Sequence, residues 1–253
     1  MTTPNRSGTD CFVALFESLP RQGQGSRECT ARTLRMCEQL PPAPRIVDLG
    51  CGAGAHTVDR AQLTAGSGVA VDRHAPFRAV VDARAAAQGL SGRVHALTAD
   101  MTETGLPPRG ADLVWSEGAL YNIGLDAALP LCRGLLRPGG CLAFTEPVRR
   151  RPDVPATVRD AFAEHPGMGA VADVLGALTA QDYEVIGHFT LPEAVWWEEF
   201  YTPMATRIAE LREGDEWPAE ALPVLEMCQA EIDMFREHSD CYACEFFVAR
   251  PRD

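Results

Sequence analysis

A short segment of the chain combines residue types that suit chemistry on a bound molecule. It reads "DLVWSEGALYNIG" from Asp112 to Gly124, and it begins as a buried strand would. An acid, a phenol and an amide follow the apolar run, namely Glu117, Tyr121 and Asn122. A carboxylate in this position orients a protonated amine, accepts a hydrogen bond from a hydroxyl or acts as a base. We therefore expect Glu117, Tyr121 and Asn122 to be catalytic.

Each of these residues also has a simpler interpretation. Glu117 fits an exposed acid at the end of a strand, and Tyr121 and Asn122 fit local capping of a turn or helix. Trp115 lies inside the apolar run and favours the core. Ser116 ends the run, and we expect its hydroxyl either to contact a cofactor or to form a hydrogen bond with the backbone. The choice depends on whether a ligand approaches this end of the strand.

A glycine-rich stretch predicts such a ligand. In "IVDLGCGAGAHT" a short apolar strand ends in Asp48, and Gly50, Gly52 and Gly54 follow at alternate positions. The glycines allow a tight turn whose amides, with the N-terminus of the next helix, face an open cleft. The second predicted strand ends in Asp72, 24 residues after Asp48, where an acid suits the hydroxyls of a ribose. The spacing is GxGxG, whereas a dinucleotide-binding fingerprint has GxGxxG.

These motifs resemble those of the class I S-adenosylmethionine-dependent methyltransferases. The resemblance runs from about Arg45 to Glu146 and includes "ALTADMTE" and "LLRPGGCLAFTEP". It implies S-adenosylmethionine as cofactor and S-adenosylhomocysteine as product. It also implies that the glycine stretch holds the methionine end, an acid after the second strand holds the ribose and an acid after the third binds the adenine amine. The residues expected at the cofactor on this basis are Asp48, Gly50, Gly52, Gly54, Asp72, Asp100 and Met101.

Three further segments are similar to those of a subgroup of small-molecule methyltransferases. These are "RQGQGS" near the start and "LPEAVWWEEFY" in the second half, together with "WSEGALYNIG". Arg21 in the first segment is expected to bind the carboxylate of the cofactor or an acidic substrate, or else to be a surface charge. The second segment supplies candidate substrate-binding aromatic residues, which also fit a helical stripe of core residues. They are Trp196, Trp197, Phe200 and Tyr201.

Apolar runs alternate with helical patterns along the chain. This alternation predicts a doubly wound α/β fold with a mainly parallel seven-stranded sheet, the last strand antiparallel. The predicted strands are Arg45–Leu49, Gly68–Asp72, Val94–Thr98, Asp112–Ser116, Cys141–Thr145, Tyr183–Leu191 and Cys241–Ala249. Helices are predicted between the first five strands, at 11–19, 26–39, 156–164 and 170–179, and two or three more within 192–238. We expect one domain, comprising an N-terminal cap at 1–44, a cofactor-binding core at 45–147, a helical lid at 191–238, and the rest of the sheet and helices at 148–190 and 239–253.

The composition restricts partners and chemistry. A net charge of −12 over 253 residues argues against nucleic acid as a partner. All 23 basic residues are arginine, which excludes Schiff-base chemistry and a P-loop lysine. No signal peptide or membrane span is apparent, so a cytoplasmic protein with reduced cysteines and no membrane partner is expected. Cys241 and Cys244 form a CxxC pair in a strand pattern, where their side chains point to opposite faces, so we expect no metal.

The sequence thus predicts methyl transfer from S-adenosylmethionine to a small molecule by in-line displacement. An amine or another cationic or polar metabolite is the expected acceptor, because aromatic faces beside a carboxylate favour a cation. The alternatives are a nicotinamide-dependent oxidoreductase and a regulatory module that binds the cofactor without catalysis. A protein acceptor also stays open, and the sequence does not indicate an oligomeric state.

Overall fold

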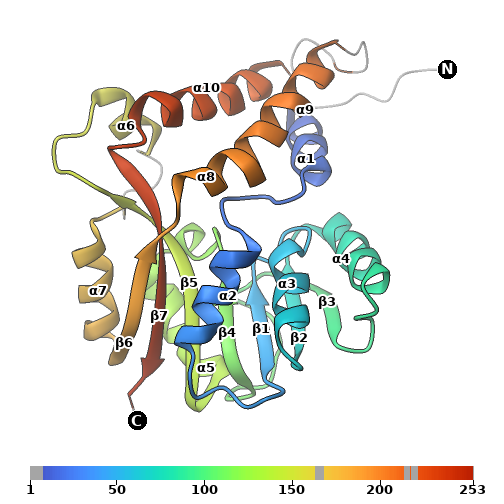
Figure 1. The fold of residues 1–253 in the computed structure, drawn as a ribbon, viewed down its shortest axis with the longest axis vertical. Helices are drawn as coiled ribbons and strands as arrows, with labels where there is room; N and C mark the ends of the chain where they lie inside the picture. The colour runs from blue at the N-terminus through green and yellow to red at the C-terminus, as the bar shows by residue number, and fades with distance from the viewer. Residues whose placement is uncertain (1–7, 163–167, 214–216, 218–221, 253) are drawn as a thin grey trace.

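A seven-stranded sheet forms the centre of the computed structural model, which describes residues 8–162, 168–213, 217 and 222–252. The strand order is β3-β2-β1-β4-β5-β7-β6. The strands are β1 Arg45–Leu49, β2 Ser67–Asp72, β3 Val94–Thr98, β4 Ala111–Ser116, β5 Leu136–Arg149, β6 Tyr183–Thr190 and β7 Tyr242–Pro251. Helices cover both faces of this sheet, as Figure 1 shows.

The strands pair in parallel from β3 to β5, whereas β7 runs antiparallel between β5 and β6. The predicted fold class and the reversed last strand are therefore confirmed. The chain leaves β1 towards β2 on one side and later returns to β4 on the other side. This reversal creates a crevice at the carboxyl ends of β1 and β4, the usual ligand position in such sheets.

Side chains alternate between two packed layers. On β4, Leu113 and Trp115 point into the layer that contains α1, α2 and the helices before β7, whereas Val114 points towards α5. A third cluster joins α3 and α4 to β2 and β3. The helices are α1 Gly8–Ser18, α2 Arg27–Met36, α3 Ala55–Leu63, α4 Ala75–Ala87, α5 Leu125–Leu135, α6 Ala156–Ala161, α7 Val171–Ala180, α8 Glu193–Trp196, α9 Thr202–Glu213 and α10 Leu222–His238.

A helical layer lies above the carboxyl ends of the parallel strands. It contains α8, a π-helical segment at Trp197–Tyr201, α9 and α10, which connect β6 to β7, and α1 packs on α9 and α10. Figure 1 shows these helices stacked over one end of the sheet. N-terminal residues and residues from the second half of the chain therefore cover the same crevice. Within the described residues, no helix is long and apolar enough to cross a membrane.

Some predicted boundaries differ from the structure. The strand predicted at Cys141–Thr145 extends over Leu136–Arg149, because the "RPGG" stretch stays extended and Leu136 pairs with Ala111 of β4. The helix predicted at 156–164 ends at Ala161, and its predicted last residues lie outside the described part of the chain. Ser26 is the N-cap of α2, since its Oγ accepts from the amide of Cys29 at 3.2 Å.

Candidate active site

A cavity of about 580 Å³ opens at the carboxyl ends of the parallel strands. Its walls come from the loops after β1, β2, β3 and β4, with additional residues from the N-terminal segment and from α10. Eight of the residues expected at the cofactor or in catalysis line it: Gly50, Gly52, Asp72, Asp100, Met101, Glu117, Tyr121 and Asn122. Loops that follow strands far apart in the sequence thus meet at one place.

Two glycines shape the floor of the cavity. Gly50 has a φ of +73°, and a Cβ built there would lie 2.3 Å from Cβ of Ala119. Gly52 has a φ of +53°, and its Cβ would lie 3.0 Å from Oε1 of Gln22. Any larger residue would enter the space beside the turn, so glycine is required by both conformation and room. Gly54 does not line the cavity; it precedes α3 and packs against Val81 of α4.

Asp72 connects the glycine turn to the end of β2. Its Oδ2 accepts from the amide of Gly52 at 2.9 Å, and its Oδ1 accepts from the amide of His74 at 2.9 Å. The carboxylate is therefore fixed by backbone donors while it lines the cavity. A fixed carboxylate beside a glycine turn is the arrangement that binds two adjacent hydroxyls.

Asp100 and Met101 form the far end of the same cavity, after β3. Asp100 is exposed and accepts hydrogen bonds from the hydroxyl and amide of Thr102, which lower the pKa of its carboxyl. Met101 contributes a half-buried thioether surface beside it. A planar ring could contact the apolar side chain while an amine group meets the acid.

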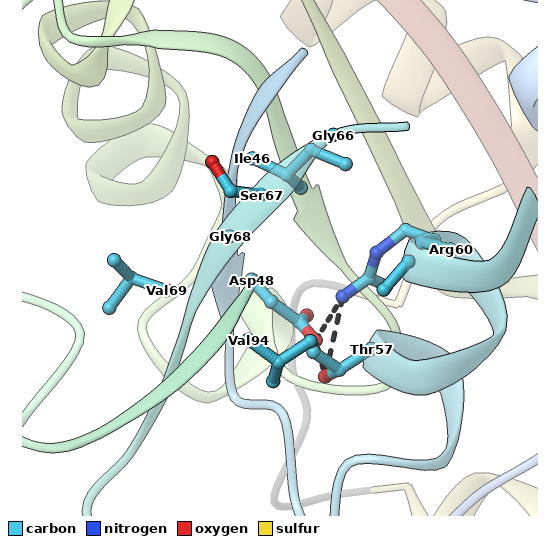
Figure 2. Close-up of a pocket in the computed structure, with 10 residues that line it drawn as sticks. Ile46, Asp48, Thr57, Arg60, Gly66, Ser67, Gly68, Val69 and Val94 are labelled. Atoms are coloured by element: carbon cyan, nitrogen blue, oxygen red, sulfur yellow. Dashed lines mark hydrogen bonds and ion pairs between the residues drawn. The ribbon is translucent and has the colours of Figure 1, made fainter. Parts of the chain in front are cut away.

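Asp48 lies outside the cavity, which corrects its expected place at the cofactor. Figure 2 shows its carboxylate pointing towards α3, where it accepts from the hydroxyl of Thr57 and the guanidinium of Arg60. All three side chains are buried, and they border a separate void of about 10 Å³. This void is smaller than a cofactor requires. Asp48 therefore anchors α3 to β1.

The buried Arg60 extends this contact towards the site. Its guanidinium carbon lies 4.7 Å from the ring centroid of Trp115, a cation–π arrangement. Trp115 is fully buried, as its place in the apolar run predicted, and its indole Nε1 donates to Oε1 of Glu117 at 2.7 Å. Contacts therefore connect Asp48 through Arg60 and Trp115 to Glu117, the candidate catalytic acid.

Glu117 is a buried carboxyl in the wall of the cavity. Its side chain is 2% exposed, and Nδ1 of His56 lies 3.0 Å from its Oε1. Its Oε2 has no hydrogen-bond partner within the described residues. Burial raises the pKa of Glu117 to about 8, although the hydrogen bond from Trp115 and the charge of Arg60 oppose this effect. The simpler interpretation of an exposed acid is therefore wrong.

His56 belongs to the site, although the sequence supplied no reason to name it as a candidate. It lines the cavity from the first turn of α3. Burial, together with the charges of Arg21 and Arg60, lowers its pKa well below the ordinary value, so the ring is neutral near pH 7. Its place directly after the glycine turn was the one available signal.

Arg21 does not line the cavity, contrary to its expected contact with the cofactor. It pairs with Asp59 of α3 at 2.5 Å and with Glu199 of the π-helical segment at 3.0 Å, and it lies 2.7 Å from Nδ1 of His56. These partners take its donors and leave it buried. The neighbouring Gln22 lines the cavity instead, and its Oε1 accepts from the amide of Ala53 at 2.8 Å.

Ser116 also lies outside the cavity. Its hydroxyl donates to the carbonyl of Leu49 at 2.8 Å, so it ties β4 to β1 rather than contacting a ligand. Asn122 does line the cavity, and its amide donates to the carbonyl of Ala119 at 2.8 Å, so local capping and a place at the site coexist.

A second cavity of about 940 Å³ lies under α10, and we call it the lid chamber. It shares with the first cavity the residues Gln24, Gly118, Tyr121, Met227 and Glu231. Among the aromatic candidates, Trp196 and Tyr201 line the chamber and Phe200 lines the first cavity. Trp197 lines neither; it packs against Phe235 and under Arg236. Trp196, Phe200 and Tyr201 thus line cavities, as substrate-binding candidates should, whereas Trp197 has only the packing role of a core residue.

Comparison with known proteins agrees with this geometry. A family model described as "Methyltransferase domain" matches residues 46–140, from β1 into β5. Dimethylglycine N-methyltransferase of Parasynechococcus marenigrum (strain WH8102) is 34% identical over 151 residues, which are 56% of this chain and 51% of that protein. The chain thus spans about half the length of that relative. The trans-aconitate 2-methyltransferase of Paracidovorax citrulli (strain AAC00-1) is 26% identical over 200 residues, 76% of this chain and 75% of that protein.

A solved structure has the same fold over almost the whole chain. It is a SAM-dependent methyltransferase from Geobacter sulfurreducens in complex with S-adenosyl-L-homocysteine. The TM-score is 0.82 at 21% identity, covering 96% of this chain and 98% of that chain. Residues 46–140 thus match the methyltransferase domain family, and the whole chain has the fold of an S-adenosylmethionine-dependent methyltransferase. Its cofactor is S-adenosylmethionine, and the GxGxG spacing is explained without a nicotinamide cofactor.

The cavity of this methyltransferase fits that cofactor. Gly50 and Gly52 let Ala119 and Gln22 pack closely against the turn, and the turn itself lines the cavity. Asp72 lies where the ribose hydroxyls are expected, and Asp100 and Met101 lie where the adenine is expected.

Among the described residues, no group of three or more His, Cys, Asp or Glu is placed to hold a metal ion. Of the CxxC pair, Cys244 lines the lid chamber and Cys241 is buried before β7.

Proposed function

We propose that this methyltransferase methylates the nitrogen of a small-molecule amine. The observation that carries the proposal is Glu117, a buried carboxyl whose Oε2 has no partner within the described residues and whose side chain lines the cofactor cavity. The neighbouring lid chamber is large enough for an acceptor, since small-molecule sites measure roughly 300–1,000 Å³. The printed names of the two relatives, a dimethylglycine and a trans-aconitate methyltransferase, support a small-molecule acceptor.

We propose that Asp72 holds the ribose, that Asp100 and Met101 hold the adenine, and that the turn at Gly50 and Gly52 receives the methionine end. When bound, S-adenosylmethionine supplies a methyl group that its sulfonium sulfur has made electrophilic. The protein therefore needs to align the acceptor and exclude water more than it needs to activate the donor. The helical layer over the crevice supplies that cover.

We assign Glu117 the role of accepting a proton from the acceptor. In the molecules whose Glu117 is ionised, a fraction that grows as the pH approaches 8, an acceptor that enters as an ammonium ion gives its proton to a Glu117 oxygen, which leaves a lone pair on the nitrogen. The lone pair would then be free to accept the methyl group that the bound cofactor would supply. The pKa of Glu117, about 8, makes it a stronger base than an exposed carboxylate. Trp115 fixes Oε1, and we assign Tyr121 and Asn122 the orientation of the acceptor.

Calorimetric titration tests the cofactor assignment. We expect S-adenosylmethionine and S-adenosylhomocysteine to bind the wild-type protein, and Asp72→Ala to lose about tenfold or more in affinity because a charge-assisted contact to the ribose is removed. Asp82→Ala, an exposed acid on α4, is the matched control and should bind normally. Unchanged affinity in Asp72→Ala would remove Asp72 from the site.

Methylation assays then test the reaction. Mass spectrometry of an amine, thiol and hydroxyl panel should detect methylated amines with the wild type and a large loss of rate with Glu117→Gln. Cofactor binding without turnover on any acceptor would favour the regulatory module. A nicotinamide difference spectrum, with no binding of S-adenosylhomocysteine, would favour the oxidoreductase.

A further inference from the structure

The lid chamber has an acidic and aromatic lining. Its acidic residues are Asp160, Glu231, Asp233 and Glu237. Among the described residues that line it, none is an arginine, and His238 is the one basic group. Carboxylate ligands are bound in proteins mainly by arginine and by clustered backbone donors. The lining therefore offers no arginine to an anion, although Asp160, Asp233 and Glu237 are exposed and pair with Arg159, Arg236 and His238. Glu231 is the acid of this lining that has no ion pair among the described residues.

Glu231 stands where the chamber meets the cofactor cavity, because it lines both. The hydroxyl of Tyr201 donates to its Oε1 at 2.9 Å, and Tyr201 is 1% exposed. Burial raises the pKa of Glu231 above its ordinary value, and the hydrogen bond from Tyr201 offsets only part of this increase. The buried tyrosine thus holds a partly desolvated carboxylate at the junction.

Aromatic rings form the wall behind this carboxylate. Trp196 and Tyr242 line the chamber with Tyr201, and Trp196 stacks on Phe235 with centroids 4.2 Å apart. Tyr242 is 2% exposed, and its hydroxyl has no hydrogen-bond partner within the described residues. Rigid aromatic faces beside an acid bind organic cations through their ring quadrupoles. An unpartnered hydroxyl in the same wall leaves one polar group for a ligand.

We propose that the lid chamber binds the acceptor as an organic amine with an apolar body and no carboxylate. The ammonium lies against Glu231 at the junction, and the body fills the aromatic part of the chamber. This assignment rests on the proposed amine methylation. The proposed acceptor differs from the compounds in the names of the two relatives, because dimethylglycine and trans-aconitate both carry carboxylates. Glu231 is then a specificity-determining residue that also stabilises the positive charge of the methylated product.

Binding to protein saturated with S-adenosylhomocysteine tests this assignment without turnover. The probes are N,N-dimethylbenzylamine, phenylacetate, which has the same body with the opposite charge, and dimethylglycine. We expect the amine to bind about tenfold or more tightly than either other probe, as one charge-assisted contact provides. Glu231→Gln, measured at an S-adenosylhomocysteine concentration that saturates the variant, should remove that preference. Tyr201→Phe, which keeps the carboxylate and the ring, should weaken amine binding less.

The control is Glu226→Gln, an exposed acid on the same helix, which should bind all three probes like the wild type. Equal or tighter binding of phenylacetate or dimethylglycine would overturn the chamber assignment alone. Unchanged amine affinity in Glu231→Gln would overturn it as well. Failure of S-adenosylhomocysteine itself to bind would instead overturn the proposed function, and the chamber assignment with it.

Discussion

Asp48 shows how a residue in a cofactor motif acts through its neighbours. Its carboxylate holds Arg60, which is 1% exposed and lies over Trp115, whose indole holds Glu117. A buried ion pair adds little net stability, but a buried charge without its partner is costly. The acid is therefore needed to keep α3 and the side chain of Glu117 in place.

We predict that Asp48→Asn destabilises the protein by about 3–5 kcal/mol, because Arg60 loses its charged partner in a buried position. Urea unfolding measures this loss. The double variant Asp48→Asn with Arg60→Met should recover most of it, since no buried charge remains. If Asp48 were a direct cofactor ligand, affinity for S-adenosylhomocysteine would fall while the free energy of unfolding stayed constant.

The raised pKa of Glu117 makes stability depend on pH. The folded protein keeps a proton on this carboxyl from about pH 4.5 to 8, where the unfolded chain has lost it. Stability attributable to this group therefore falls as pH rises through that window. The groups that face it are Trp115, His56, Arg21 and Arg60, with Asp48 farther along the network.

We predict that Glu117→Gln becomes more stable than the wild type as pH increases. The Tm of the variant should equal that of the wild type at about pH 5 and exceed it by several degrees at about pH 9, since about 1 kcal/mol corresponds to roughly 2–4 °C. Thermal unfolding at both pH values measures this, with Glu226→Gln as control. A constant Tm difference across the range would show that Glu117 ionises normally.

At the scale of elements, the N-terminal segment holds α3 and the π-helical segment together. Arg21 joins this segment to α3 through Asp59 and to the π-helical segment through Glu199, while Gln22 contacts the glycine turn through the amide of Ala53. One buried arginine therefore connects three elements that border the crevice. Arg21, Asp59 and Glu199 thus hold the elements around the crevice together, although none of the three lines the cavity.

We predict that Arg21→Met lowers affinity for S-adenosylhomocysteine several-fold and speeds amide hydrogen exchange in residues 20–25, because the segment loses its charged contacts. Asp59→Asn should reproduce part of both effects. Arg27→Met, which removes a more exposed partner of Asp59, should change neither. A loss in Arg21→Met that Asp59→Asn does not share would indicate a direct contact between Arg21 and the cofactor.

At the scale of the whole molecule, the cofactor should stabilise the fold, since its cavity joins four strand ends, the N-terminal segment and α10. A ligand at 100 times its Kd adds about 2.7 kcal/mol. We predict that S-adenosylhomocysteine raises the Tm by roughly 5–10 °C. Asp72→Ala at the same concentration should show a much smaller shift. An equal shift in both proteins would indicate binding elsewhere.

The sequence by itself determined the order of elements and the cofactor loops. Alternation of apolar runs with helical patterns fixes a parallel sheet, and Gly50, Gly52 and Asp72 follow strands whose carboxyl ends must meet. These features are local or follow from the rules of sheet topology, so spacing and residue type suffice to predict them.

Only the tertiary structure decided which polar residues face the ligand. Asp48, Ser116 and Arg21 carry the right groups at plausible positions, yet their hydrogen bonds go to α3, β1 and the lid. Glu231 lines both cavities without any distinctive motif, and His56 lines the first from a position directly after the glycine turn. A side chain's direction and partners depend on contacts between segments distant in sequence, and burial of Glu117 under those segments produces its raised pKa.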